Sequence, residues 1–257
     1  FSTGSNGKLT NINLSNVGFE IEPVKNLIFQ TGFSYRILES ASKTFSLDYY
    51  TTLPTVANPS GVIKSDVKQS EANIQIEYTP NRKTIGFGVE RDIVDSPYSR
   101  FFVNYSHGFK GVLDSDFKYE KLQLYYKQPI IIGPLGRTNI IMELGKTFGT
   151  VPLGLMSVIP GNQTYFTIEN TFSNLNFYEF VSDQYASLQF NHNFEGLLFN
   201  RIPLIKKLKW RFIASSNVLM GSQRNSNLQR TPRYWGFVCQ SLDEQQSDVY
   251  SGYDVHT

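Results

Sequence analysis

The sequence predicts an all-β fold, an antiparallel up-and-down outer-membrane β-barrel, and three observations predict it. Apolar and polar residues alternate along 71–78, where one face of a strand would carry Ala72, Ile74, Ile76 and Tyr78. Stretches of this kind recur at about 9–11 residues, the length of a tilted membrane-spanning strand. Charged residues make up only 18% of the chain, below the quarter or so typical of soluble domains, and no apolar run reaches the roughly 18 residues of a membrane helix.

The first two predicted strands form a hairpin. Residues 16–22 alternate Val17, Phe19 and Ile21 with polar or small residues, and the alternation resumes at 27–37 after a short turn. The following segment, 39–69, is rich in Ser, Thr, Asp and Pro. We expect it to be a long loop with a weak strand at 45–50, carrying a hairpin beyond the membrane.

Three strands are predicted in the middle of the chain, at 71–79, 100–107 and 117–127. Residues 80–98 contain two prolines and several Gly, Asn and Asp residues, so we expect a connection there and no span. Residues 129–136 begin with Pro129, which lacks a backbone donor, so we expect an apolar turn.

The last predicted strands are 137–147, 184–194 and 208–219. Residues 148–183 read as a long excursion with a short strand near 164–169, and 197–207 as an apolar and basic turn. Alternation then stops. We therefore divide the chain into barrel strands with their loops at 1–221 and an irregular tail at 222–257, and we expect the closing strand to be missing.

The connections fall on two sides of this meander of roughly eight strands, which supports the strand count. Barrels of this kind have short periplasmic turns and long extracellular loops. We assign to the periplasm the connections 22–26, 80–98, 129–136 and 197–207. We assign to the outside the connections 39–69, 108–116 and 148–183. An open sheet edge is not tolerated in lipid, so a piece of a larger barrel would need further strands.

The polar residues between the apolar ones are expected to line the lumen of the barrel. These lumen-facing residues are Glu71, Gln75, Glu77, Gln123, Glu143, Gln189 and Asn191.

The 148–183 loop carries more apolar residues than an exposed loop needs, and long loops within compact domains tend to be functional. We expect 148–170 to fold back over or into the mouth of the barrel. The residues we assign to this lumen loop are Leu153, Leu155, Met156, Pro160 and Asn162.

Charge and cysteine usage limit the possible partners and cofactors. A net charge of +2 gives no support for nucleic-acid binding, and a lone Cys239 gives no disulfide framework. His107 and His192 lack the spaced partners of a metal site, so we expect no metal, no cofactor and no catalytic residues. The chain begins FSTGSNGK without an export signal, so we expect further sequence upstream.

Long motifs in the chain resemble a known family. They are YSRFFVNYSHGFKGVLDSDFKYEKLQL, IGPLGRTNIIMELGKTFGTVPLGLMSVIPGNQTYF and NFYEFVSDQYASLQFNHNFEGLLFNRIPLIKKLKWR, within 97–218. They resemble outer-membrane proteins of the Bacteroidota that have no assigned activity. Members often carry a carboxypeptidase-regulatory-like β-sandwich, absent here, ahead of a C-terminal barrel. That barrel resembles the surface-antigen superfamily, which includes the BamA insertase and two-partner secretion pores.

The resemblance implies part of a barrel of about sixteen strands, and in that superfamily an extracellular loop enters the lumen. Our first hypothesis is a non-enzymatic barrel of the Gram-negative outer membrane that handles protein or lipid by an insertase-like or translocation mechanism. Its partners would be outer-membrane lipid and periplasmic or outer-membrane proteins.

Three other functions remain open. One is a passive pore or structural barrel. Another is an outer-membrane lipase, which needs a serine within hydrogen-bond reach of His192. The last is a soluble β-sandwich or adhesin.

Overall fold

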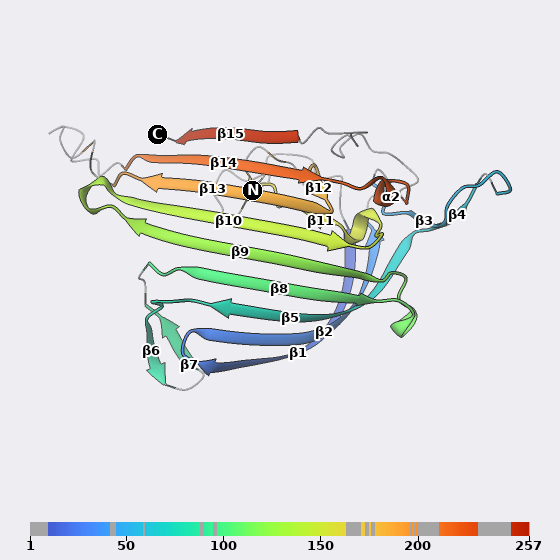
Figure 1. Ribbon diagram of the computed structural model, residues 1–257, viewed down its shortest axis with the longest axis horizontal. Coiled ribbons are helices and arrows are strands. Elements are labelled where there is room, and N and C mark those ends of the chain that lie inside the picture. Colours follow the sequence, from blue (N-terminus) through green and yellow to red (C-terminus); the bar gives the residue numbers. More distant parts are fainter. Residues whose placement is uncertain are drawn as a thin grey trace.

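One large antiparallel sheet dominates the molecule. The computed structural model describes residues 10–41, 45–58, 60–87, 90–94, 97–162, 171–172, 175, 178–195, 197, 199, 211–230 and 248–256. Nine strands form the sheet in the order β1-β2-β5-β8-β9-β10-β13-β14-β15 (Figure 1). Their bounds are β1 Thr10–Val24, β2 Leu27–Ser40, β5 Asp66–Tyr78, β8 Arg100–Phe109, β9 Tyr119–Ile131, β10 Arg137–Phe148, β13 Gln184–Asn193, β14 Ile213–Ser222 and β15 Asp248–His256. The predicted all-β, antiparallel, up-and-down arrangement is confirmed, since each strand pairs with the next one along the sheet.

The strand β9 is longer than predicted, and the expected turn at 129–136 is wrong at its start. β9 continues to Ile131, and Pro129 lies opposite Asn139 of β10. Pairing between β9 and β8 ends at Arg100 and Lys127. Beyond that point β9 has a neighbour on one side only, where a proline is tolerated because no ladder bond needs its missing donor.

The tail also differs from the irregular segment expected at 222–257. It contains the short helix α2 Asn225–Leu228, and β15 pairs with β14 from Ile213 and His256 to Gly221 and Asp248. The hydrogen bonds of this ladder join backbone groups, so an outer strand can form without the apolar alternation that is typical of the other strands.

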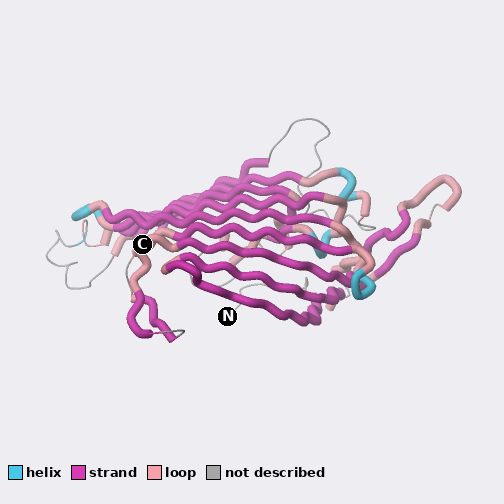
Figure 2. The backbone as a smooth tube through the Cα atoms, turned by 60° about the horizontal axis from the view of Figure 1, so that its bottom comes forward, coloured by secondary structure: helices cyan, strands magenta, loops and turns pink. Residues whose placement is uncertain are grey.

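Small hairpins lie beyond both ends of the main strands (Figures 1 and 2). At one end β3 Tyr49–Thr52 pairs with β4 Val62–Lys64, within the loop expected to carry a hairpin. At the other end β6 Thr84–Phe87 pairs with β7 Glu90–Ile93 inside the predicted connection 80–98. A third pair, β11 Ser157–Val158 and β12 Val181–Ser182, lies in the 148–183 excursion. The short strand predicted near 164–169 and most of 197–207 lie outside the described residues.

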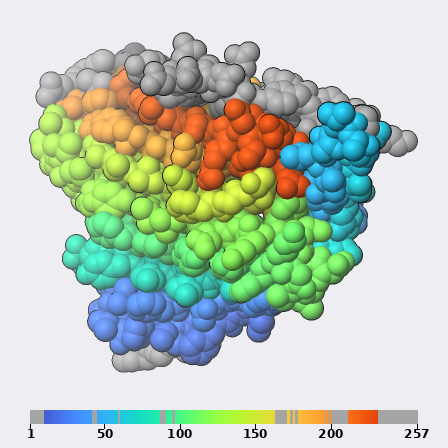
Figure 3. All heavy atoms as spheres, turned by 45° about the vertical axis from the view of Figure 1, so that its right-hand side comes forward, coloured from blue at the N-terminus to red at the C-terminus, as the bar shows by residue number. Residues whose placement is uncertain are grey.

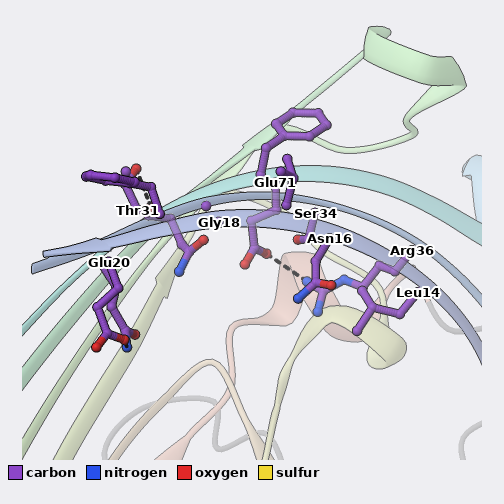
Figure 4. Close-up of a pocket in the computed structure, with 14 residues that line it drawn as sticks. Leu14, Asn16, Gly18, Glu20, Thr31, Ser34, Arg36 and Glu71 are labelled. Carbon is purple, nitrogen blue, oxygen red and sulfur yellow. Dashed lines mark hydrogen bonds and ion pairs between the residues drawn. The ribbon is translucent and has the colours of Figure 1, made fainter. Parts of the chain in front are cut away.

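The sheet is curved and its two faces differ in chemistry. Residues directly opposite one another in the ladders share a face. One such row is Asn16, Ser34, Glu71, Gly108 and Tyr119. Figure 4 shows Asn16, Arg36 and Glu71 on the inner side of the arching strands, so we call their face the concave face and the opposite one the convex face.

The main hydrophobic core covers one end of the concave face. It joins Leu38 and Val67 of the sheet to loop residues such as Leu47, Val151 and Leu155. The β3–β4 hairpin lies against the α2 region (Figure 3). There Arg230 donates from Nη1 to the carbonyl oxygen of Tyr50 at 2.8 Å. The buried end therefore brings together segments that are far apart in the sequence.

Candidate functional site

The concave face carries all seven residues predicted to be lumen-facing. Gln75 and Gln123 lie in one row that runs across Asn104, and Glu77 and Glu143 lie in the next row. The other three residues share this face by strand parity: Glu71, Gln189 and Asn191. One sheet surface therefore concentrates carboxylates, amides and cations at a place where water or polar ligands can meet them.

An ionic network crosses β2, β5 and β9 on this face. Arg36 donates from Nη2 to Glu71 Oε2 at 2.7 Å and to the Tyr119 hydroxyl at 2.8 Å. The Tyr119 hydroxyl in turn donates to Glu71. Charge-assisted bonds of this kind are stronger than neutral ones, and they fix the side chains across three strands.

A hollow of about 530 Å³ lies beside this network, along β1, β2 and β5 (Figure 4). Its lining includes Asn16, Glu20, Ser34, Arg36 and Glu71. This part of the concave face is uncovered among the described residues. Polar groups line it from three adjacent strands.

A second network lies on β9, β10 and β13. Gln123 donates from Nε2 to Glu143 Oε1 at 2.7 Å, and the Tyr185 hydroxyl donates to the same oxygen at 2.5 Å. The Tyr185 ring lies on Gly145, where an added Cβ would come within 2.2 Å of the ring. The glycine therefore lets the ring lie flat on the sheet and direct its hydroxyl to Glu143.

The segment 149–162 folds over the concave face. Of the predicted lumen-loop residues, Leu153, Leu155, Met156 and Asn162 are buried, whereas Pro160 is exposed. The first three belong to the main core. We call 149–162 the inward segment. The remainder of the predicted loop, 163–170, lies outside the described residues.

A buried aspartate fixes the inward segment to the sheet. Asp183 Oδ2 accepts hydrogen bonds from the Arg224 backbone N–H at 3.1 Å and from Asn227 Nδ2 at 3.0 Å. Asn227 Oδ1 accepts from the backbone N–H of Val151 at 3.0 Å. Arg224 also donates from Nη2 to the carbonyl of Thr147 at 2.7 Å. We call Asp183, Arg224 and Asn227 the latch, because they join β10, the start of β13 and the region after β14 to the inward segment.

The convex face is apolar and exposed. Apolar side chains with more than a third of their surface exposed occur on this face in seven strands of the main sheet: β1, β5, β8, β9, β10, β13 and β14. They include Val17, Phe19, Ile74, Val103, Leu124, Met142, Leu188 and Met220. Aromatic rings cluster on it: Phe101 lies 4.5 Å from Tyr126 and 6.3 Å from Tyr78, between ring centroids. An apolar surface of this extent marks a site of contact with membrane or another protein.

His192, the candidate base of a lipase, is engaged in a structural contact. Its cross-strand neighbours are Thr138 and Ala214, so the hydroxyl beside it belongs to a threonine. Thr138 Oγ1 lies 2.7 Å from Nδ1, and the carbonyl oxygen of Leu135 lies 3.1 Å from Nε2. A carbonyl only accepts, so Nε2 carries the proton and Nδ1 accepts from the threonine. This arrangement ties the η2 turn, Gly133–Leu135, to the sheet.

The described residues show no metal cluster and no membrane-spanning helix. They contain no group of three or more His, Cys, Asp or Glu side chains placed to hold a metal ion. None of their helices is long and apolar enough to cross a membrane.

Sequence reasoning missed the partners that complete these networks. Arg36, Tyr119 and Tyr185 share the concave face with the predicted residues, and strand parity alone was enough to place them there. Asp183 and Asn227 gave no such signal, because they lie outside the alternating stretches.

Comparison with known proteins assigns a family but no activity. Neither the curated proteins nor the solved structures contain a match. Residues 13–228 match the C-terminal domain of a family of unknown function, DUF5686. Because the match covers most of the chain, including β2 to β14 entire, this protein belongs to the DUF5686 family.

Proposed function

We propose that this domain forms part of an outer-membrane β-barrel of about sixteen strands in a Gram-negative bacterium of the Bacteroidota, and that it acts without catalysing a reaction. The barrel handles protein or lipid at the outer membrane by an insertase-like or translocation mechanism. Its work is conformational, through movement of the inward segment and of the strands. Its partners are membrane lipid and periplasmic or outer-membrane proteins.

The observation that carries this proposal is the contrast between the two faces of the sheet. The convex face exposes aliphatic and aromatic side chains across at least seven strands, whereas the concave face carries ionic and amide networks. Exposing so much apolar surface to water is unfavourable, and a lipid-facing strand removes that cost. Alternation of apolar-out and polar-in residues is the pattern of membrane barrels.

The inward segment favours a closed, gated barrel over a passive pore. Leu155 and Met156 are buried against the concave face, and the latch holds Val151 at the segment's start. A segment fixed in this way narrows the polar interior.

Planar-bilayer recording of the full-length gene product tests this function. The proposal predicts a mostly closed baseline, with brief openings that become more frequent in Asp183→Ala, which removes the acceptor of the latch. Asp114→Ala is the matched control, because Asp114 is an exposed aspartate at the same end of the sheet. We expect this control to stay closed.

Two outcomes of that recording would contradict the gated mechanism. Steady ohmic channels in the unmodified protein would favour the passive pore. Equally frequent openings in Asp183→Ala and Asp114→Ala would show that the latch does not hold the barrel closed. Rapid protease cleavage near Leu155 in intact cells would show that the inward segment is exposed, which also contradicts the proposal.

A further inference from the structure

The β3–β4 hairpin is joined at its base to the segment that follows β14. Tyr50 donates from its backbone N–H to the carbonyl oxygen of Arg230 at 2.8 Å. Arg230 donates in return from Nη1 to the carbonyl oxygens of Tyr50 at 2.8 Å and of Thr51 at 3.0 Å. Hydrogen bonds from a guanidinium are charge-assisted and stronger than neutral ones. Backbone and side chain of one arginine therefore fix the edge of β3.

The helix α2 connects this contact to the latch. The backbone N–H of Arg230 donates to the carbonyl oxygen of Asn227 at 3.2 Å, so the two residues belong to one helical turn. Asn227 is fully buried, and its side chain bonds to the backbone N–H of Val151 and to Asp183. A displacement of Arg230 therefore acts on the residue that holds the start of the inward segment.

A second connection between the hairpin and the inward segment is hydrophobic. Leu47, just before β3, and Tyr49, its first residue, are almost completely buried and belong to the main core together with Val151 and Leu155. A Cβ added to Gly154 would lie 3.7 Å from the Leu47 side chain, so the backbone of the inward segment passes close to that side chain. Protein interiors are close-packed, so the base of the hairpin and the inward segment constrain each other's position.

The other edge of the hairpin is fixed to the main sheet. Lys64 of β4 donates from Nζ to Asp116 at 2.9 Å, and Asp116 also accepts from the backbone N–H of Lys68 on β5 at 2.9 Å. The tip of the hairpin extends beyond the sheet (Figures 1 and 2), and Val56 there is completely exposed. A displacement of the tip is thus resisted by the sheet on the β4 side and transmitted to α2 on the β3 side.

We propose that the β3–β4 hairpin controls the position of the inward segment through Arg230 and the latch. While β3 is bound to Arg230, the latch holds the inward segment on the concave face. When β3 moves away from Arg230, α2 loosens, Asn227 releases Val151 and the inward segment can leave that face. This regulation rests on the proposed function, in which the inward segment closes the barrel, whereas the linkage between hairpin and segment does not depend on it.

Limited proteolysis of the full-length protein in detergent micelles tests the linkage. Arg230→Met removes the donors to β3 and keeps a long side chain, and we expect cleavage within 149–162 to become about fivefold faster. Arg230→Lys should show a smaller increase, because the ammonium can still donate to one of the carbonyls. Arg137→Met is the matched control: Arg137 pairs with Glu195 at 2.9 Å at the opposite end of β10, and its loss should leave that cleavage unchanged.

A reciprocal measurement keeps the test decisive if Arg230→Met fails to fold. A linkage between two parts of a molecule acts in both directions. With spin labels at Ala57→Cys on the hairpin tip and Leu124→Cys on the main sheet, in a Cys239→Ser background, we expect Asp183→Ala to broaden the distribution of the distance between the labels. We also expect cleavage within 149–162 in Arg230→Met/Asp183→Ala to be less than about twofold faster than in Asp183→Ala alone, because both changes break the same path.

Three results would overturn the inference. One is equal cleavage within 149–162 in Arg230→Met and Arg137→Met. Another is an unchanged distance distribution in Asp183→Ala. The third is cleavage that rises equally over the whole chain in Arg230→Met, which would show a general loss of stability. None of them bears on whether the convex face contacts lipid or whether the channel is closed at rest, so failure of this linkage and failure of the proposed function can be told apart.

Discussion

The two faces of the main sheet are made by the same strands but meet opposite environments. On β13, Leu188 of the convex face is 42% exposed, whereas its neighbour Gln189 of the concave face is 5% exposed. In a protein surrounded only by water the reverse would be expected, because apolar side chains are usually the buried ones. The difference supports our proposal that the apolar face meets lipid, the surroundings that an alternating strand suits.

The faces also differ in what stabilises them. The concave face depends on directed contacts, such as Arg36 with Glu71 and Tyr185 with Glu143. Among the described residues, the convex face carries ring contacts such as that of Phe101 with Tyr126. On the proposed function, a change on the concave face acts through local geometry, and a change on the convex face acts through transfer into lipid.

The largest effect is expected from a charge on the convex face. Leu188→Arg places a guanidinium near the middle of β13 and should lower the free energy of unfolding in lipid vesicles by about 2–4 kcal/mol. Asn191→Arg, on the concave face of the same strand, should have a much smaller effect. Urea unfolding followed by tryptophan fluorescence measures both. Equal losses in the two variants would contradict the assignment of the faces.

Breaking the latch is expected to have the next largest effect. Asp183→Ala leaves Asn227 Nδ2 and the Arg224 backbone N–H without their acceptor. We expect a loss of about 1–3 kcal/mol, together with faster proteolysis within 149–162. Limited proteolysis with mass spectrometry locates the cuts. If cleavage instead increases uniformly over the chain, the latch does not act on the inward segment.

Two glycines of the concave face, Gly145 and Gly18, distinguish the effect of steric crowding from that of backbone entropy. Gly145→Ala would place a Cβ 2.2 Å from the Tyr185 ring, so the ring must move away from Glu143, at a cost of about 1–3 kcal/mol. At Gly18 the nearest atom would lie 3.4 Å from the added Cβ. Gly18→Ala should therefore be neutral or stabilise the fold by up to about 1 kcal/mol. We expect Gly145→Ala to lower the melting temperature measured in detergent, and Gly18→Ala to leave it unchanged or raise it.

The smallest effect is expected from the aromatic contacts of the convex face. Phe101→Leu removes the ring pair with Tyr126 while keeping an apolar side chain, so we expect a loss of about 0.5–1.5 kcal/mol. Val103→Leu, on the same strand and face, serves as the control and should change little. A loss in Phe101→Leu as large as that in Leu188→Arg would mean that packing, and not transfer to lipid, dominates this face.

The strands, and the face of the sheet on which each residue lies, could be predicted because apolar and polar residues alternate in the sequence with a period of two. Ile74 and Gln75 needed only that period to be placed on opposite faces. The ends of the strands could be predicted less well. β5 begins at Asp66, five residues before the alternation, because Gln69 is fully buried there and bonds to the backbone carbonyls of Phe109 and Phe117.

The partners of the site could be predicted only in part. The position of Lys121 on the concave face follows from the parity of β9. The pairing of Glu71 with Arg36, across strands far apart in the sequence, does not follow from that parity. Asp183 and Asn227 are brought together by the excursion between β10 and β13 and by the segment after β14. Residues that make contacts between irregular segments follow no sequence period, so no local pattern predicts those contacts.

Paired cysteine labelling in proteoliposomes tests the central claim most directly. In a Cys239→Ser background, single cysteines replace Ile74 and Leu188 on the convex face and Glu20 and Asn73 on the concave face. The account predicts that a membrane-impermeant maleimide modifies the concave pair and spares the convex pair. It also predicts that only fluorophores at the convex positions are quenched by brominated lipid. Full modification at Ile74 and Leu188, without quenching, would contradict it.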